Sequence, residues 1–179
     1  MSKIDRRILK SQEAIKNAVV ALMNEKEFDL ITMQDISDRA NVTRKTIYLH
    51  YKDKYDLLDK LIEEHINELW DICYSESASA AHLTWFEYFE REYSFFSVMI
   101  ASKGAPFFRS RFLDFVIKDI RNGWEMIEGK KIGLNEEVMI QFFAPAYVGL
   151  VEWWFTNGMP YPPRMMEEQV TIMLEKNLL

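Results

Sequence analysis

Residues 32–58 read TMQDISDRANVTRKTIYLHYKDKYDLL, and this stretch decides the fold. Thr32 is a good N-cap residue, and Asp35 stands three residues later, where a second capping side chain helps. Asn41 tolerates the left-handed backbone that a sharp helix exit often needs. Thr43 then caps a second short helix whose first turn is basic. This pattern is typical of a helix-turn-helix, whose second helix enters the major groove of DNA.

Helices are predicted on both sides of this stretch, because apolar residues recur there at three- and four-residue steps. One helix spans about residues 5–26, and another begins near Asp53 and runs beyond the small module. We therefore expect an all-α fold. Its predicted parts are an N-terminal three-helix helix-turn-helix domain (residues 1–52), a connecting helix (53–74) and a C-terminal helical domain for effector binding and dimerisation (75–179).

The C-terminal half carries its own start and stop signals. Leu83–Ile100 is predicted to be one helix, or two helices broken near Ser94. Pro106 suits a helix start, and Asn135 is expected to cap a helix that ends near Thr156. The last helix begins near Pro163. The predicted loops and breaks are residues 75–82, 129–133 and 158–163.

The composition suits a protein with a sizeable core, since 49% of its residues are hydrophobic and 14% aromatic. The longest apolar runs are well short of the roughly 18 residues that span a bilayer, and the N-terminus has no apolar signal segment. Cys73 is the only cysteine, so no internal disulfide is possible, and His50, His65 and His82 do not cluster with it at zinc spacing. We expect a cytoplasmic protein with no membrane segment and no metal.

The net charge of −6 is unevenly distributed. Residues 1–60 carry 12 Lys and Arg against 10 Asp and Glu, whereas residues 61–179 carry 10 against 18. Basic character is therefore concentrated near the helix-turn-helix, where it would steer the chain towards phosphates. A basic N-terminal arm either reaches DNA or is simply the solvated start of a helix; it holds Lys3, Arg6, Arg7 and Lys10.

A known family shares these motifs. The segment Val42–Tyr48, followed by His50–Tyr51, Lys54 and Leu57, resembles the DNA-binding segment of the tetracycline-repressor (TetR) family. One departure is Asn41, where that family usually has glycine. Further along, Gly149–Trp154 and Asn157–Tyr161 are similar to the C-terminal domain type common among TetR-like regulators of Firmicutes. The resemblance implies a homodimer whose last two helices pair with their copies in a four-helix bundle.

The helix-turn-helix pattern also predicts individual DNA contacts. Arg44 and Lys45 lie in the first turn of the second helix, where they would bond either guanine edges or phosphates. Lys54, at the start of the following helix, suits a phosphate. The alternative is a solvated basic face. The predicted contacts to double-stranded DNA are Thr32, Gln34, Thr43, Arg44, Lys45, Thr46, Tyr48, His50 and Lys54.

The helix over residues 135–156 carries two apolar stripes instead of one. A helix at the surface normally buries a single stripe, so the second would face a partner subunit. The alternative is a fully buried central helix in a monomer. Pro145 is expected to kink this helix. The residues predicted at the dimer interface are Phe142, Ala146, Gly149, Leu150, Trp153, Met166, Val170 and Met173.

The aromatic residues of the C-terminal half suggest a cavity for a small hydrophobic or aromatic effector. The resemblance implies that such a ligand shifts the spacing of two DNA-reading heads. Aromatic stripes at helical spacing are equally explained as plain core. The predicted lining residues are Trp85, Phe89, Tyr93, Phe108, Phe112, Phe115 and Trp124.

No motif indicates catalysis, since the chain has neither a Gly-rich phosphate loop nor a Gly-x-Ser-x-Gly elbow. We expect no enzyme, no catalytic residue and no cofactor. The leading hypothesis is a homodimeric repressor that a small effector releases from a palindromic operator. The alternatives are a TetR-like activator or co-regulator controlled by a protein partner, and a helical interaction protein that does not bind DNA.

Overall fold

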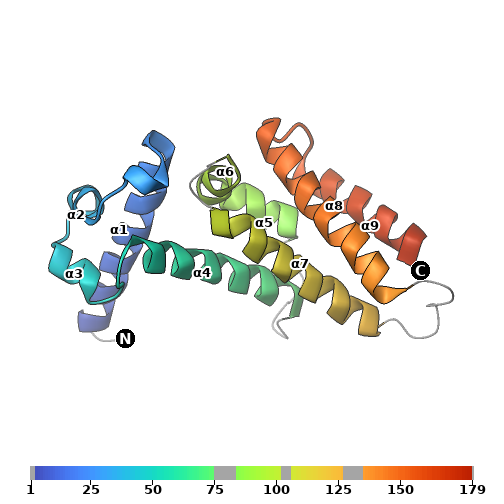
Figure 1. Cartoon of the computed structure of the whole chain (residues 1–179), viewed down its shortest axis with the longest axis horizontal. Helices are drawn as coiled ribbons and strands as arrows, with labels where there is room; N and C mark the ends of the chain where they lie inside the picture. The colour runs from blue at the N-terminus through green and yellow to red at the C-terminus, as the bar shows by residue number, and fades with distance from the viewer. Residues whose placement is uncertain (1–2, 75–83, 102–105, 127–134, 179) are drawn as a thin grey trace. The chain divides into compact units, whose positions relative to one another are not determined.

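The computed structural model describes residues 3–74, 84–101, 106–126 and 135–178 (Figure 1), and every regular element among them is helical. The predicted all-α fold is confirmed. The elements are α1 (Lys3–Glu25), η1, a 3₁₀ turn (Phe28–Leu30), α2 (Met33–Ala40), α3 (Arg44–Tyr48), α4 (Lys54–Tyr74), α5 (Trp85–Arg91), α6 (Tyr93–Ala101), α7 (Pro106–Met126), α8 (Glu136–Thr156) and α9 (Pro163–Leu178).

The chain divides into two compact units, and α4 contributes to both. The first comprises Met1–Asn67 together with the short segment Ala101–Ala105, and the second comprises Glu68–Ile100 and Pro106–Leu179. The predicted connecting helix is thus a single helix, although its residues belong to the units on either side rather than to a separate linker.

The first unit is built around the apolar face of α1, on which Ile15, Val19 and Leu22 are buried. This face packs against α2 and α3. Ile36 and Ile47, one from each short helix, are completely buried. The three-helix module therefore has its own core, and the polar sides of α2 and α3 remain in solvent.

The turn between α2 and α3 has the predicted geometry. Thr32 and Asp35 form a reciprocal capping box at the start of α2, and Thr43 caps α3. Asn41 has φ 51° and ψ 46°, the left-handed conformation for which asparagine is one of the few suitable residues. The buried hydroxyl of Ser37 donates to the carbonyl of Val42 at 2.7 Å, which holds the turn closed.

In the described part of the second unit, the end of α4 is followed by α5 to α9; α7 packs on α8, and α5 packs on α9. The break predicted near Ser94 lies at Glu92, where α5 ends and α6 begins. Asn135 caps α8 as predicted, and α7 and α9 begin at the predicted prolines. The α8–α9 break is also confirmed, with Gly158 and Met159 both at positive φ. The predicted loops 75–82 and 129–133 lie outside the described residues.

Helix α8 is long and apolar enough to cross a membrane by length and composition alone. Several of its side chains are instead buried in the second unit, which is how the core helix of a folded domain passes the same test. The helix is continuous through Pro145. Its fully buried positions are Ile140, Ala144, Val151 and Trp154.

Candidate functional site

The first turn of α3 presents basic side chains to solvent. Arg44 and Lys45 are exposed, and no carboxylate in the described part of the chain forms an ion pair with either. The Arg44 guanidinium lies 5.9 Å from the centre of the Tyr48 ring, which supports it from one side. The hydroxyl groups of Thr43 and Thr46 share a hydrogen bond at 2.9 Å. This turn is therefore a preformed cationic surface.

The C-terminal end of α3 adds two exposed apolar groups. Tyr48 is 48% exposed and Leu49 is 72% exposed. Leu49 is not among the contacts predicted from the sequence, because an apolar residue next to a helix is equally well explained as part of the core. An exposed aliphatic side chain beside a basic turn suits the methyl group of thymine. His50 is half-buried, and its carbonyl accepts a hydrogen bond from Lys60 at 3.0 Å.

The N-terminus of α2 is also exposed, but its side chains already have local partners. The Thr32 hydroxyl accepts from the backbone N–H of Asp35 at 3.1 Å and donates to the Asp35 carboxylate at 2.7 Å. Gln34 donates to the carboxylate of Asp38 at 2.7 Å. A contact from either side chain to DNA would have to compete with these hydrogen bonds.

The prediction that the Lys54 ammonium binds phosphate does not agree with its position. The group donates to three backbone carbonyls, those of Phe28 at 3.0 Å, Asp29 at 2.8 Å and Ile31 at 2.9 Å. An ammonium has three N–H donors, so all of them are used. Nor is the helix start open to an anion, because the carboxylate of Asp53 accepts from the first-turn N–H groups of α4. Lys54 instead ties α4 to η1, directly before α2 begins.

Replacing Lys54 with methionine tests this assignment. Methionine keeps the apolar stem but leaves the three carbonyls without their donor, so the free energy of unfolding should fall by about 2 kcal/mol. Urea unfolding measures the change. Lys52→Met is the matched control, since Lys52 is exposed two residues away, and it should change stability little. Equal stability of the two variants would contradict a structural role for Lys54.

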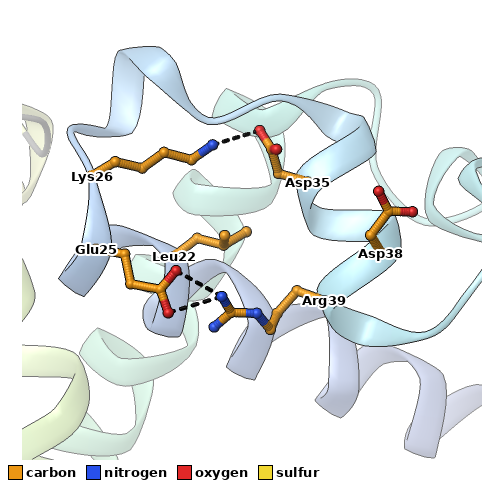
Figure 2. A pocket seen from close by; sticks show the side chains of 6 residues that line it. All are labelled: Leu22, Glu25, Lys26, Asp35, Asp38 and Arg39. Atoms are coloured by element: carbon orange, nitrogen blue, oxygen red, sulfur yellow. Dashed lines mark hydrogen bonds and ion pairs between the residues drawn. The ribbon is translucent and has the colours of Figure 1, made fainter.

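Two ion pairs join the end of α1 to α2 around a shallow polar hollow (Figure 2). Lys26 lies 2.8 Å from Asp35, and Arg39 contacts both carboxylate oxygens of Glu25 at 2.7 and 2.8 Å. These pairs and the capping box converge on α2. They fix how the helix-turn-helix is held against α1, and no cation of the hollow is left unpaired among the side chains drawn in Figure 2.

The Asp35 carboxylate makes stability depend on pH. Its hydrogen bonds to Lys26 and Thr32 hold its pKa well below the ordinary aspartate value. Because the pKa of Asp35 is lower in the folded chain than in the unfolded chain, its ionised carboxylate stabilises the fold at any pH above the ordinary aspartate pKa. This stabilisation is lost as the pH falls from that value towards the lowered pKa. Asp35→Asn should therefore lower the melting temperature at neutral pH, and the difference from the unmodified protein should narrow below about pH 4. Asp38→Asn, in the same hollow, is the control for removing one carboxylate from α2.

One stripe of α8 is left uncovered in the second unit. Phe142 is 70% exposed and Trp153 42% exposed, and Ala146 lies between them with an exposed side. Gly149 belongs to the same stripe, and a Cβ added there would meet no atom within 4 Å. Of the other stripe predicted on this helix, which runs Phe143, Tyr147, Leu150 and Trp154, only Trp154 is buried, and the other three side chains are half-buried. The outward stripe therefore has the exposure expected of a partner-facing side, whereas the inward side of α8 is formed mainly by Ile140, Ala144, Val148 and Val151.

The predicted interface residues of α9 need correction. Met166 and Val170 are buried in their own unit at 4% and 8% exposure, because they form the inward face of the helix. Met173 is 47% exposed, as expected of an interface residue, and so is Met165 at 42%. The sequence pattern alone did not show which of the two adjacent methionines, Met165 or Met166, turns inwards.

Most of the residues predicted to line an effector pocket lie in the core instead. Phe89, Phe108, Phe112 and Phe115 are buried at 4% exposure or less and pack ring against ring. None of these four lines the cavity of about 570 Å³ that the second unit contains. Trp85 does line it. Tyr93 is exposed and stacks on Phe155, and the Trp124 side chain lies outside the described residues.

Two protein families match the chain, one over the helix-turn-helix and the other over the C-terminal part. Residues 15–61 match the family described as "Bacterial regulatory proteins, tetR family", and residues 76–176 match "Transcriptional regulator C-terminal region". The second match alone covers more than half of the chain. The chain belongs to the TetR family of transcriptional regulators.

Relatives of this TetR-family chain agree with that assignment. An uncharacterised HTH-type transcriptional regulator, YxbF of Bacillus subtilis (strain 168), is 24% identical over 97% of the chain. The chain spans 47% of the length of that relative. A solved TetR transcriptional regulator from Streptococcus agalactiae 2603V is 25% identical, with a TM-score of 0.73 and coverage of 95% of this chain and 96% of that one.

Two further solved structures share the fold. One is the fatty acid degradation regulator FadR from Bacillus halodurans, with 16% identity and a TM-score of 0.70. The other is the dihydroxyacetone kinase operon activator DhaS, with 17% identity and a TM-score of 0.64. Each match covers 94% of this chain and 96% of the other chain. At these identities the likeness concerns the fold alone.

A TetR-family assignment points to regulation rather than catalysis. Among the described residues, no group of three or more His, Cys, Asp or Glu side chains is placed to hold a metal ion. The side chain of Cys73 is not among those the structure describes. The residues that remain as candidates for function are the exposed turn of α3, the outward stripe of α8 and the cavity of the second unit.

Proposed function

We propose that the protein is a homodimeric transcriptional repressor that binds a palindromic DNA operator and is released from it by a small-molecule effector. The observation that carries the proposal is the exposed first turn of α3, where Arg44 and Lys45 have no carboxylate partner among the described residues. It lies on a helix-turn-helix whose caps and turn are fully formed. Repression follows where the bound dimer excludes the polymerase.

The DNA contacts are expected from α3 and its neighbours. Arg44 and Lys45 would reach guanine edges or phosphates in the major groove, and Thr43, Thr46 and Tyr48 would contact the backbone. The exposed N-terminus of α2, with Thr32 and Gln34, would hold the other side of the groove, and His50 lies at the far end of α3. Lys54 contributes indirectly, because it holds the segment that leads into α2.

Dimerisation is supported by the outward stripe of α8. A single helix-turn-helix reads few base pairs, whereas a two-fold dimer reads two half-sites. Phe142, Ala146, Gly149 and Trp153 form a continuous apolar line along one helix face, with small residues at its centre. Met173 adds an exposed apolar group from α9. Such a face is costly in water and is stabilised when a second copy covers it.

An activator is the second candidate function. DhaS, which shares the fold at 17% identity, is named as an operon activator, and that name supports an activator as the alternative. A transcription assay from a promoter that carries the bound sequence separates the two. The proposed repressor lowers transcript yield when added alone. A rise in yield would favour the activator, and the cytoplasm is the expected location in either case.

Substitutions in α3 test the DNA-binding role. Arg44→Ala or Lys45→Ala should remove a contact of about 1–3 kcal/mol if that side chain reads a base, and the preferred sequence should change. If it contacts phosphate, affinity should fall for all sequences and the salt dependence should become shallower by about one charge. Fluorescence anisotropy at several salt concentrations measures both.

The matched control is Lys118→Ala, which removes one exposed charge from α7 in the second unit. It should leave the affinity for DNA unchanged. If it weakens binding as much as the α3 substitutions do, only the overall charge matters. A folded protein that shows no salt-dependent DNA binding would favour the helical interaction protein instead.

A further inference from the structure

The second unit contains a cavity of about 570 Å³, a size that suits a small organic ligand. Side chains from α4, α5, α7, α8 and α9 line it, so several elements distant in sequence meet there. Trp85 and Tyr147 are in edge-to-face contact at 5.5 Å in its wall. Most of the other lining residues are apolar, among them Phe142, Ala146 and Met173.

The charged groups among the described residues of the wall are both negative. Asp119 and Glu167 contribute carboxylates, whereas no lysine, arginine or histidine is among the described residues that line the cavity. Asp119 accepts a hydrogen bond from the Tyr74 hydroxyl at 2.8 Å, which orients its carboxylate. An aromatic cavity with acidic groups attracts cations in two ways, because carboxylates and ring faces both carry negative potential.

Glu167 is the more unusual of the two carboxylates. It is half-buried on α9, and within the described residues no hydrogen bond or ion pair joins it to a cation. Burial and the nearby carboxylate of Glu87 raise its pKa. Glu87 differs, because it has Arg164 at 3.3 Å and the N–H of Thr84 at 2.9 Å. An ionised Glu167 is therefore uncompensated, and a bound cation would stabilise it.

We propose that this cavity binds an organic cation, with an aromatic or aliphatic body against Trp85 and Tyr147 and an ammonium group facing Glu167 and Asp119. Charge decides the ligand class. An acyl carboxylate or phosphate of equal size would lie beside two carboxyl groups, and no lysine, arginine or histidine is among the described lining residues to compensate its charge. The proposal rests on the effector release in the proposed function, and it names the chemical class of that effector.

The position of the cavity explains how such a ligand would act. Phe142, Ala146 and Met173 line the cavity and also belong to the outward face of α8 and α9. A ligand that alters how these side chains pack alters the surface offered to a second copy. It changes DNA affinity only if it binds one arrangement of the dimer more tightly than the other.

Calorimetric titration with two matched probes tests the site. The cation is (1-naphthylmethyl)trimethylammonium, and the anion is 1-naphthylacetate, which carries the same ring system. The cation should bind once per subunit and the anion should not. Glu167→Gln should weaken cation binding about tenfold, and Asp119→Asn should also weaken it. Glu168→Gln, on the exposed side of α9, should not. Circular dichroism checks that each variant is folded.

Three results would overturn the site. Both probes could bind equally, or Glu167→Gln and Glu168→Gln could have equal effects on cation binding. The third result is cation binding only after the dimer is dissociated, because this would mean that the second copy fills the cavity in the dimer. A DNA titration separates this proposal from the proposed function. If the cation binds through Glu167 but leaves DNA affinity unchanged, the site stands and effector release fails. If no cation binds a protein that holds DNA tightly, the site fails and the regulator stands.

Discussion

Replacing Gly149 with leucine is expected to reduce affinity for a DNA fragment with two half-sites by at least about 100-fold, which corresponds to roughly 2.7 kcal/mol. The glycine lies in the outward stripe of α8 between Ala146 and Trp153. A Cβ at this position meets no atom of its own subunit within 4 Å, so leucine would extend towards the partner. Each subunit should remain folded, but the two α8 helices would no longer approach closely. A monomer would then read one half-site alone.

Analytical ultracentrifugation shows whether the dimer is lost, and anisotropy measures the DNA affinity. Gly123→Leu is the matched control, because Gly123 is an exposed helical glycine on α7 and its added Cβ also meets no atom within 4 Å. That variant should remain dimeric and bind DNA normally. If Gly149→Leu sediments as a dimer and binds DNA with unchanged affinity, the α8 stripe is not the dimer interface.

Trp154→Ala should have the largest effect on stability, about 3–5 kcal/mol of the free energy of unfolding. Trp154 is completely buried and is the largest of the fully buried side chains. Its indole N–H donates to the carbonyl of Tyr161 at 2.8 Å, which fixes the segment between α8 and α9. Its ring also meets Phe86 of α5 edge to face at 5.3 Å. Alanine removes both of these contacts and leaves a cavity.

Trp154→Phe separates the contributions. Phenylalanine fills most of the space but leaves the Tyr161 carbonyl without its donor, so we expect a loss of about 1–3 kcal/mol. Chemical denaturation measures the free energy of unfolding of both variants, and alanine should lower it more than phenylalanine does. If alanine costs no more than phenylalanine, the packing of Trp154 against α5 contributes little, and the arrangement of α5, α8 and α9 would have another cause.

Local features were predictable from the sequence because their causes are local. The caps at Thr32, Thr43 and Asn135 each need one side chain and the N–H groups two or three residues later. The left-handed Asn41 follows from the few residue types that adopt this conformation. These features define the helix-turn-helix, so the sequence alone predicts the candidate site on α3.

Features that depend on packing could not be located in this way. Phe89 and Phe112 belong to aromatic stripes at helical spacing, a pattern that fits the lining of a ligand pocket and a plain core equally well. Only the three-dimensional packing shows that these two side chains fill the core. The Lys54 ammonium is another example, since its carbonyl partners lie 23 to 26 residues earlier in the chain. Glu167 resembles any surface glutamate in sequence, and its position in a cavity depends on α5, α7 and α8.

Selection of bound sequences from a random pool of double-stranded DNA, with the purified protein at physiological salt, tests the central claim most directly. The account predicts an enriched inverted repeat whose half-sites are related by two-fold symmetry, because two α3 helices of a dimer read equivalent bases. The same selection with Arg44→Ala should recover a different half-site or none. A folded protein that enriches no sequence, or enriches only a single unrepeated site, would contradict a dimeric, sequence-specific regulator.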